Sequence, residues 1–239
     1  MELAYQTALT IESVIKDIDS KKYLLPSIQR EFVWSTGQIE KLFDSLMRDY
    51  PINAFLFWKV PREKVSEFKF YEFLRDYHQK DNKHNPKANT NGTEDIIAVL
   101  DGQQRMTSLY IALKGTYAYK TSYKRWDNPA AYPKRKLYLN LLAASDDADM
   151  FYDFLFLTEE EAKNIKNAND EYEGAFWFPV GKILDFREES DVNDYLIDND
   201  LNTVADKAQA KFANKALFKL YSVIHNKQTI SYYLEESTE

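Results

Sequence analysis

The sequence predicts an α+β fold, on three observations. Strand-like and helix-like segments alternate over the first half of the chain, while helical patterns dominate the second half. Hydrophobic residues make up 44% of the 239 residues and aromatic residues 15%, enough to build a substantial core. No internal repeat is present. We therefore expect one folded unit over 1–239, with a core at 1–115 and a mixed, mainly helical extension at 116–239.

Two helices are predicted within the first part of this core. Apolar residues recur at helical spacing behind Thr10, which predicts a helix over 10–21. Ser35 and Gln38 form a capping box, and the apolar stripe that follows predicts a second helix. The segment between the two helices, 23–34, has no clean periodicity, so we expect it to be extended.

Further along, a strand leads directly into a helix. Apolar runs predict strands at 54–60 and 96–100, and the second of these precedes an amphipathic helix that Gly115 closes. Between the strands, 80–95 is almost free of apolar side chains, which predicts a long exposed loop. The remaining patterns predict a strand at 136–142, a polar helix and loop at 158–174, a long helix at 204–226 and a strand at 229–237.

The corner between the second strand and its helix carries a dense polar motif, DGQQR. Asp101 is a good helix N-cap, Gln104 would complete a capping box, and Gly102 permits a tight turn. These roles leave Gln103 and Arg105 unexplained, because a cation in the first turn opposes the helix dipole by roughly 0.3–1 kcal/mol. An anion at the helix N-terminus would explain both residues. An arginine that extends into solvent is about as good an account.

A second Gln-Arg pair, Gln29 and Arg30, also follows an apolar stretch and precedes a helix. If the two strands are neighbours, Arg30 and Arg105 converge on one pocket, where two guanidinium groups repel unless an anion lies between them. The alternative is an Arg30 that pairs on the surface with Glu31 or Glu40. We favour the shared anion site.

Charge and composition restrict the classes of function. The net charge of −7 argues against a surface that wraps nucleic acid along its whole length, and leaves a local basic site open. The chain has no cysteine, which excludes disulfides, thiol catalysis and thiolate metal sites. It has neither a signal-peptide pattern nor an apolar run long enough to span a bilayer, so we expect a cytoplasmic protein without a membrane partner.

Three motifs in about the first 115 residues resemble the N-terminal domain family of the GmrSD-type modification-dependent restriction endonucleases. They are LPSIQREFVW at 25–34, the YPI stretch at 50–52, and DGQQRMTSL at 101–109. Three ordered motifs form a specific match, whereas the second half is similar only in general character.

The resemblance implies a single N-terminal domain with a ParB/sulfiredoxin-like core, in which the polar corner holds nucleotide phosphates. It also implies an NTP-hydrolysing regulatory role, with Mg²⁺, in a restriction system directed against phage or other modified DNA. Cutting in that family belongs to a separate C-terminal or partner HNH-type nuclease domain. The family usually continues into a further helical motif that this sequence lacks, so we expect the chain to be a piece of a longer protein.

By the same resemblance, two sets of residues fall on the motif positions. Phosphate binding is implied for Gln29, Arg30, Gly102, Gln103, Arg105, Thr107 and Ser108. A catalytic role is implied for Asp101, Gln104 and Arg105, with Asp101 either capping the helix or holding Mg²⁺ through water. No lysine-bearing P-loop is present, so we expect slow turnover, or turnover that depends on the rest of the protein.

Other polar clusters have weaker claims. Lys134, Arg135 and Lys136 lie near aromatic residues in the sequence and are candidates for DNA contact, but we favour a solvated hairpin that balances an acidic protein. His78 and His84 lack a third fixed metal ligand, so we expect no metal site there.

Two other functions stay open. One is a DNA-binding sensor without nucleotide chemistry, which would use the basic segment at 120–136. The other is a ParB-like nuclease, which we rank last because no cluster of carboxylates accompanies Asp101.

Overall fold

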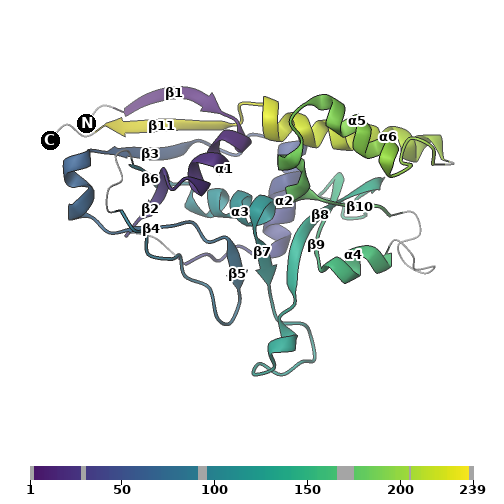
Figure 1. Cartoon of the computed structure of the whole chain (residues 1–239), viewed down its shortest axis with the longest axis horizontal. Helices are drawn as coiled ribbons and strands as arrows, with labels where there is room; N and C mark the ends of the chain where they lie inside the picture. The colour runs from purple at the N-terminus through teal and green to yellow at the C-terminus, as the bar shows by residue number, and fades with distance from the viewer. Residues whose placement is uncertain (1–2, 28–30, 91–95, 166–174, 205, 237–239) are drawn as a thin grey trace.

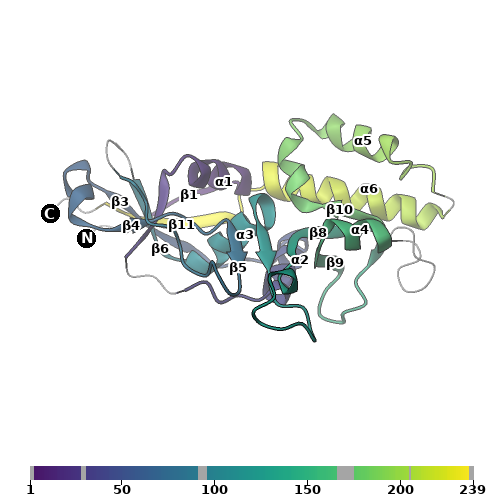
Figure 2. The same cartoon turned by 60° about the horizontal axis from the view of Figure 1, so that its bottom comes forward.

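The computed structural model describes residues 3–27, 31–90, 96–165, 175–204 and 206–236, which form a mixed α/β structure with two sheets (Figure 1). The six-stranded sheet lies at one end of an elongated molecule and the five-stranded sheet towards the other, with helices α2 and α3 between them (Figures 1 and 2). The α+β class is thus confirmed in its coarse form, while the ParB/sulfiredoxin-like core stays a prediction.

The six-stranded sheet has the order β1-β11-β3-β6-β2-β4. Its strands are β1 (Leu3–Leu9), β11 (Ile230–Glu236), β3 (Phe55–Val60), β6 (Ile96–Asp101), β2 (Tyr23–Pro26) and β4 (Phe70–Tyr71). β11 runs parallel to β3, and β2 runs parallel to β6, whereas the other pairs are antiparallel. Because β11 lies inside this sheet, the end of the described chain completes the sheet that carries the DGQQR corner.

The five-stranded sheet is organised around its longest strand, β8. It consists of β5 (Asp76–His78), β7 (Thr116–Ala118), β8 (Lys134–Ala144), β9 (Tyr152–Leu157) and β10 (Trp177–Pro179). The path runs β10-β8-β7-β5, and β9 also pairs with β8. The expected strand at 136–142 is therefore confirmed, but the expectation of a largely helical second half is not. After Gly115 the described residues contain five strands besides three α-helices.

The helices predicted from apolar spacing are present. They are α1 (Ile11–Asp19), α2 (Thr36–Met47), α3 (Gln103–Lys114) and α6 (Lys207–Tyr221), joined by α4 (Glu159–Ile165) and α5 (Glu189–Asp198). The Thr10 hydroxyl accepts from the Ser13 amide, and Ser35 and Gln38 form the predicted capping box. Short 3₁₀ helices are η1 (Arg62–Glu67), η2 (Pro129–Ala131) and η3 (Val180–Asp185), and a π-helical turn, η4 (Ser222–Asn226), follows α6.

One continuous apolar cluster packs the two sheets together. It includes Ile15 of α1, Phe43 of α2, Phe57 of β3, Leu139 of β8 and Leu217 of α6, all of them fully buried. α2 lies against β9 in the second sheet, and its C-terminal end is set by Arg48 and the left-handed Asp49 (φ 61°). Among the described residues, no helix is both long and apolar enough to cross a membrane.

Candidate functional site at the β6–α3 corner

Gly102 makes the turn between β6 and α3. Its φ of +84° lies in the left-handed region, which residues with a side chain rarely adopt. A Cβ at this position would lie 2.2 Å from the Phe55 ring, so the turn also needs the missing side chain. The predicted N-cap is therefore wrong: Asp101 is the last residue of β6, Gly102 is the N-cap, and no side chain caps α3.

The Arg105 side chain binds backbone carbonyls of the segment before β3. Its Nη1 donates to the carbonyl oxygens of Ile52 and, at 3.0 Å, of Asn53. Its Nη2 donates to the carbonyl of Ala54 at 3.2 Å, and the guanidinium lies 4.5 Å above the Phe55 ring. These contacts explain why a cation stands at the positive end of a helix: three carbonyl dipoles and an aromatic face stabilise it.

Burial lowers the pKa of the Arg105 guanidinium, and the charge of Asp101 opposes this shift. The Asp101 carboxylate lies 3.7 Å from Nη2 and is 76% exposed, whereas the Arg105 side chain is 16% exposed. The corner thus presents one accessible carboxylate beside a guanidinium that the protein already binds. This is the arrangement available for Mg²⁺ held through water, which stays a prediction.

Gln104 holds the segment that contains the first motif. Its Oε1 accepts from the Val33 amide at 3.0 Å and its Nε2 donates to the Glu31 carbonyl at 2.9 Å. The predicted capping box with Asp101 is therefore wrong, because both ends of the amide bind a distant segment instead. Gln29 and Arg30, which precede Glu31 in the sequence, lie outside the described residues, so their convergence with Arg105 stays a prediction.

The remaining motif residues bind or pack within β6 and α3. Gln103 donates from Nε2 to the Val99 carbonyl of β6 at 2.9 Å. The Ser108 hydroxyl donates to the carbonyl of Gln104, one turn earlier, at 2.8 Å, and Ser108 and Thr107 are both buried. The resemblance implies that side chains of α3 bind phosphate, but Gln103 and Ser108 bind carbonyls of the protein instead. The N–H groups in the first turn of α3 have no acceptor within the helix and stay available to a ligand.

The proposed DNA contacts divide between two faces of β8. Lys134 and Lys136 are exposed, while Arg135 between them is 4% exposed and lies 4.1 Å above the Tyr119 ring. Arg135 also lies 3.7 Å from a carboxylate oxygen of Glu161. Since alternate residues of a strand face opposite sides, Arg135 is not available to a surface ligand and the other two are.

Both histidines of the polar segment contact other residues of the protein. His78 Nδ1 accepts from the amides of Lys80 and Asp81, and His84 lies 3.5 Å from Glu31. Within the described ranges, no group of three or more residues that could bind a metal is present.

Comparison with known proteins gives the class of the chain. Residues 11–239 match the N-terminal domain family of the GmrSD restriction endonuclease, so the chain belongs to that family. Over 113 residues the chain is also 34% identical to an uncharacterized protein of Methanocaldococcus jannaschii. That region is 47% of this chain and 18% of the relative, so the chain spans only a small part of the relative's length.

Sequence reasoning missed the partners of the DGQQR motif. Arg105 and Gln104 bind backbone atoms 51 to 73 residues away, in the segments that carry the other two motifs. A signal was present, since all three motifs occur in order in the family pattern. Residue identity does not show which backbone carbonyls accept a hydrogen bond, so the motif left an anion and a solvent-exposed arginine as equal accounts of Arg105, and the second Gln-Arg pair favoured the anion.

Proposed function

We propose that this chain is a nucleotide-binding regulatory domain of a modification-dependent restriction endonuclease, and that the nucleotide phosphates bind at the N-terminus of α3. Family membership supports the restriction role. The nucleotide, its hydrolysis, Mg²⁺, modified phage DNA and a nuclease domain in the whole protein are parts of this proposal.

One observation carries the proposal: Gln104 and Arg105 fix two separate backbone segments beside the first turn of α3. The helix N-terminus supplies N–H groups and positive potential for an anion. The two hydrogen bonds from Gln104 to Val33 and Glu31, which we call the Gln104 clamp, hold the backbone next to Gln29 and Arg30 in the sequence. We assign Gln29 and Arg30 as direct phosphate ligands. Arg105, whose donors bind carbonyls, acts in this scheme as a positioning residue.

In this proposal Asp101 is the residue that holds Mg²⁺. Its carboxylate is exposed and adjacent to the helix N-terminus, where it can hold Mg²⁺ through water beside the phosphates. Hydrolysis would then depend on electrostatic stabilisation of the transferred phosphoryl group.

Calorimetric titration of the chain with ATP and GTP, each with Mg²⁺, tests the proposal. We expect Arg30→Ala to weaken binding by about tenfold or more, since it removes a charge-assisted phosphate contact. Arg187→Ala, which removes an exposed arginine elsewhere, is the matched control and keeps wild-type affinity. Equal affinity of the wild type and Arg30→Ala, or no nucleotide binding at all, would overturn the site.

DNA binding is a second candidate function, favoured by the exposure of Lys134 and Lys136 in an otherwise acidic chain. It predicts that duplex DNA binding weakens steeply with salt and needs these two lysines. A gel shift that is absent, or that does not respond to salt, argues against it.

A further inference from the structure

Two neighbouring helices far from the β6–α3 corner carry opposite charges. α6 has four lysines and no acidic residue, whereas α5 has four acidic residues and no basic one. The two helices contact each other and run in opposite directions at the end of the molecule away from the chain termini (Figures 1 and 2). A basic strip and an acidic strip therefore lie on adjacent helices.

The basic strip is a row of lysines along the exposed side of α6. Lys207, Lys211 and Lys215 follow one another at a spacing of four residues, and all three are exposed. Within the described residues no carboxylate lies within ion-pair distance of these three, while the fourth lysine, Lys219, pairs with Asp49 at 2.5 Å. Like charges at this spacing repel by roughly 0.2–0.5 kcal/mol a pair. A matching row of anions outside the chain would relieve this repulsion.

The acidic strip of α5 combines carboxylates with an apolar side chain. Asp194 and Asp198 are exposed, again four residues apart, and among the residues that the structure describes neither has an ion-pair partner. Ile197 lies on the same side of the helix, because residues three and four apart are neighbours, and it is 60% exposed. An apolar centre within a charged rim is the composition of a protein contact surface.

The two strips are complementary to each other, and a second copy of the chain presents both. If two copies face each other across a twofold axis that runs between α5 and α6 and parallel to them, α5 of each copy lies over α6 of the other. Carboxylates then meet lysines in both contacts. Ile197 meets the methylene stems of the lysine row, which provide apolar surface.

We propose that the surface formed by α5 and α6 is the interface of a homodimer, in which the Asp194 and Asp198 carboxylates pair with the lysine row of the second copy. This inference goes beyond the proposed function and does not depend on a nucleotide site at the corner.

The size of this surface predicts a weak dimer. α5 and α6 have 10 and 15 residues, and are therefore about 15 and 22 Å long and about 10 Å wide each. A face of roughly 20 by 20 Å is smaller than the ~800 Å² that each partner buries in a standard interface. We therefore expect a reversible dimer with a Kd on the order of 10 µM.

A polyanion such as nucleic acid is the competing occupant of a lysine row. The carboxylates of α5 argue against it, because the axes of packed helices are only about 8–10 Å apart and a polyanion on α6 would lie close to the acidic strip. A second copy supplies the opposite charge to each strip, whereas a ligand of one sign is repelled by one of them.

Sedimentation equilibrium of the chain at low salt measures the dimer. One variant carries Lys211→Glu and Lys215→Glu, and another carries Asp194→Lys and Asp198→Lys. Each reverses one strip and places like charges in both contacts, so we expect each to raise the dimer Kd about tenfold or more. The wild-type dimer should also weaken as salt is raised, since its ion pairs are exposed.

Two further variants complete the experiment. Lys80→Glu with Lys83→Glu changes the net charge as the α6 variant does, at exposed positions outside both helices, and is the matched control with wild-type affinity. A variant with all four substitutions on α5 and α6 exchanges the two strips and leaves the net charge unchanged. We expect it to form a dimer again, because each strip once more faces its opposite.

Three results would overturn the homodimer. One is a wild-type chain that is monomeric up to about 200 µM, well above the expected Kd. Another is an α6 variant with wild-type affinity, which would place any dimer contact elsewhere. The last is a strip-exchanged variant that has the circular dichroism of the wild type and stays monomeric, which would show that the two strips do not face each other.

Discussion

Single residues of the DGQQR motif act mainly by fixing backbone. Arg105 stands where the helix dipole disfavours a cation, and it is accommodated because three carbonyls of the 52–54 segment accept from it. The residue type of Arg105 shows that it donates hydrogen bonds, but it does not show that the acceptors are backbone carbonyls. This is why the sequence singles out Arg105 but explains it by an anion or by exposure to solvent, and not by the carbonyls that accept from it.

Replacement of Gly102 tests the corner at the level of one residue. In Gly102→Ala the new Cβ meets the Phe55 ring at 2.2 Å and the backbone stays at φ +84°, so we expect a loss of about 2–4 kcal/mol in the free energy of unfolding. Urea unfolding followed by circular dichroism measures this loss. Gly37→Ala, in the first turn of α2 with 3.9 Å to its nearest neighbour, is the control and should change stability by less than about 1 kcal/mol. Similar losses in both variants would contradict the close approach.

At the level of elements, the first turn of α3 joins segments that are far apart in the chain. The sequence predicts the helices well, because apolar spacing and caps such as Ser35 and Gln38 are local. It predicts a local capping box for Gln104, whose partners lie 71 and 73 residues away. The Gln104 side chain could bind either its own helix terminus or the 31–33 segment, and the tertiary fold determines which. No local sequence pattern distinguishes the two.

The Gln104 clamp has a direct readout in hydrogen exchange. Gln104→Ala removes the acceptor of the Val33 amide, so we expect this amide to exchange about tenfold faster or more under native conditions. Gln79→Ala is the matched control, because Gln79 accepts from the Lys120 amide in the same way. That variant should release Lys120 and leave Val33 unchanged. Protection of Val33 that is the same in Gln104→Ala and the wild type would show that the clamp contributes nothing.

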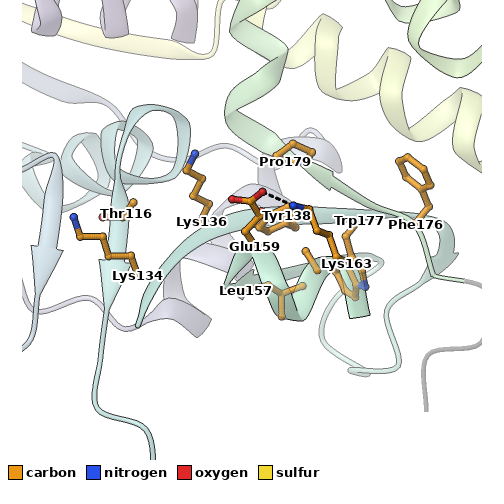
Figure 3. A pocket seen from close by; sticks show the side chains of 11 residues that line it. Thr116, Lys134, Lys136, Tyr138, Leu157, Glu159, Lys163, Phe176, Trp177 and Pro179 are labelled. Carbon is orange, nitrogen blue, oxygen red and sulfur yellow. Dashed lines mark hydrogen bonds and ion pairs between the residues drawn. The ribbon is translucent and has the colours of Figure 1, made fainter. Parts of the chain in front are cut away.

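For the whole molecule, the sequence predicts the α+β class and most elements but not how the two halves combine. The strand pattern near the end of the chain is visible, but its parallel pairing with β3 is not, and neither is the sheet built on β8. Short strands such as β7 and β10 have too few residues for a period to be recognised. The cavity at the junction of β8, β10 and α4 (Figure 3) is also invisible in the sequence, because it forms only where these elements meet.

Two carboxylates of α2 connect this helix to the five-stranded sheet, because they accept hydrogen bonds from backbone amides at β9. Asp44 is buried and accepts from Phe151 and Tyr152, and Glu40 accepts from the Phe156 amide at 3.1 Å. Burial raises the pKa of Glu40 to about 7, with a smaller contribution from the charge of Asp153, while the Phe156 hydrogen bond opposes the rise.

A carboxyl group whose pKa is higher in the folded than in the unfolded protein lowers stability as the pH rises through that interval. The cost of ionising Glu40 therefore builds up between about pH 4.5 and about pH 7 and remains at higher pH, where it reaches at most about 3 kcal/mol. Glu40→Gln keeps the acceptor for Phe156 and cannot ionise, so we expect it to match the wild type near pH 4.5 and to be more stable by about 1–3 kcal/mol at pH 8. Urea unfolding across this range measures the difference, and Glu63→Gln, at an exposed position of η1, is the control without effect. A Glu40→Gln variant with the same pH dependence as the wild type would show that Glu40 is ionised in the folded protein at no cost, and that α2 and β9 meet in a more hydrated contact than the structure describes.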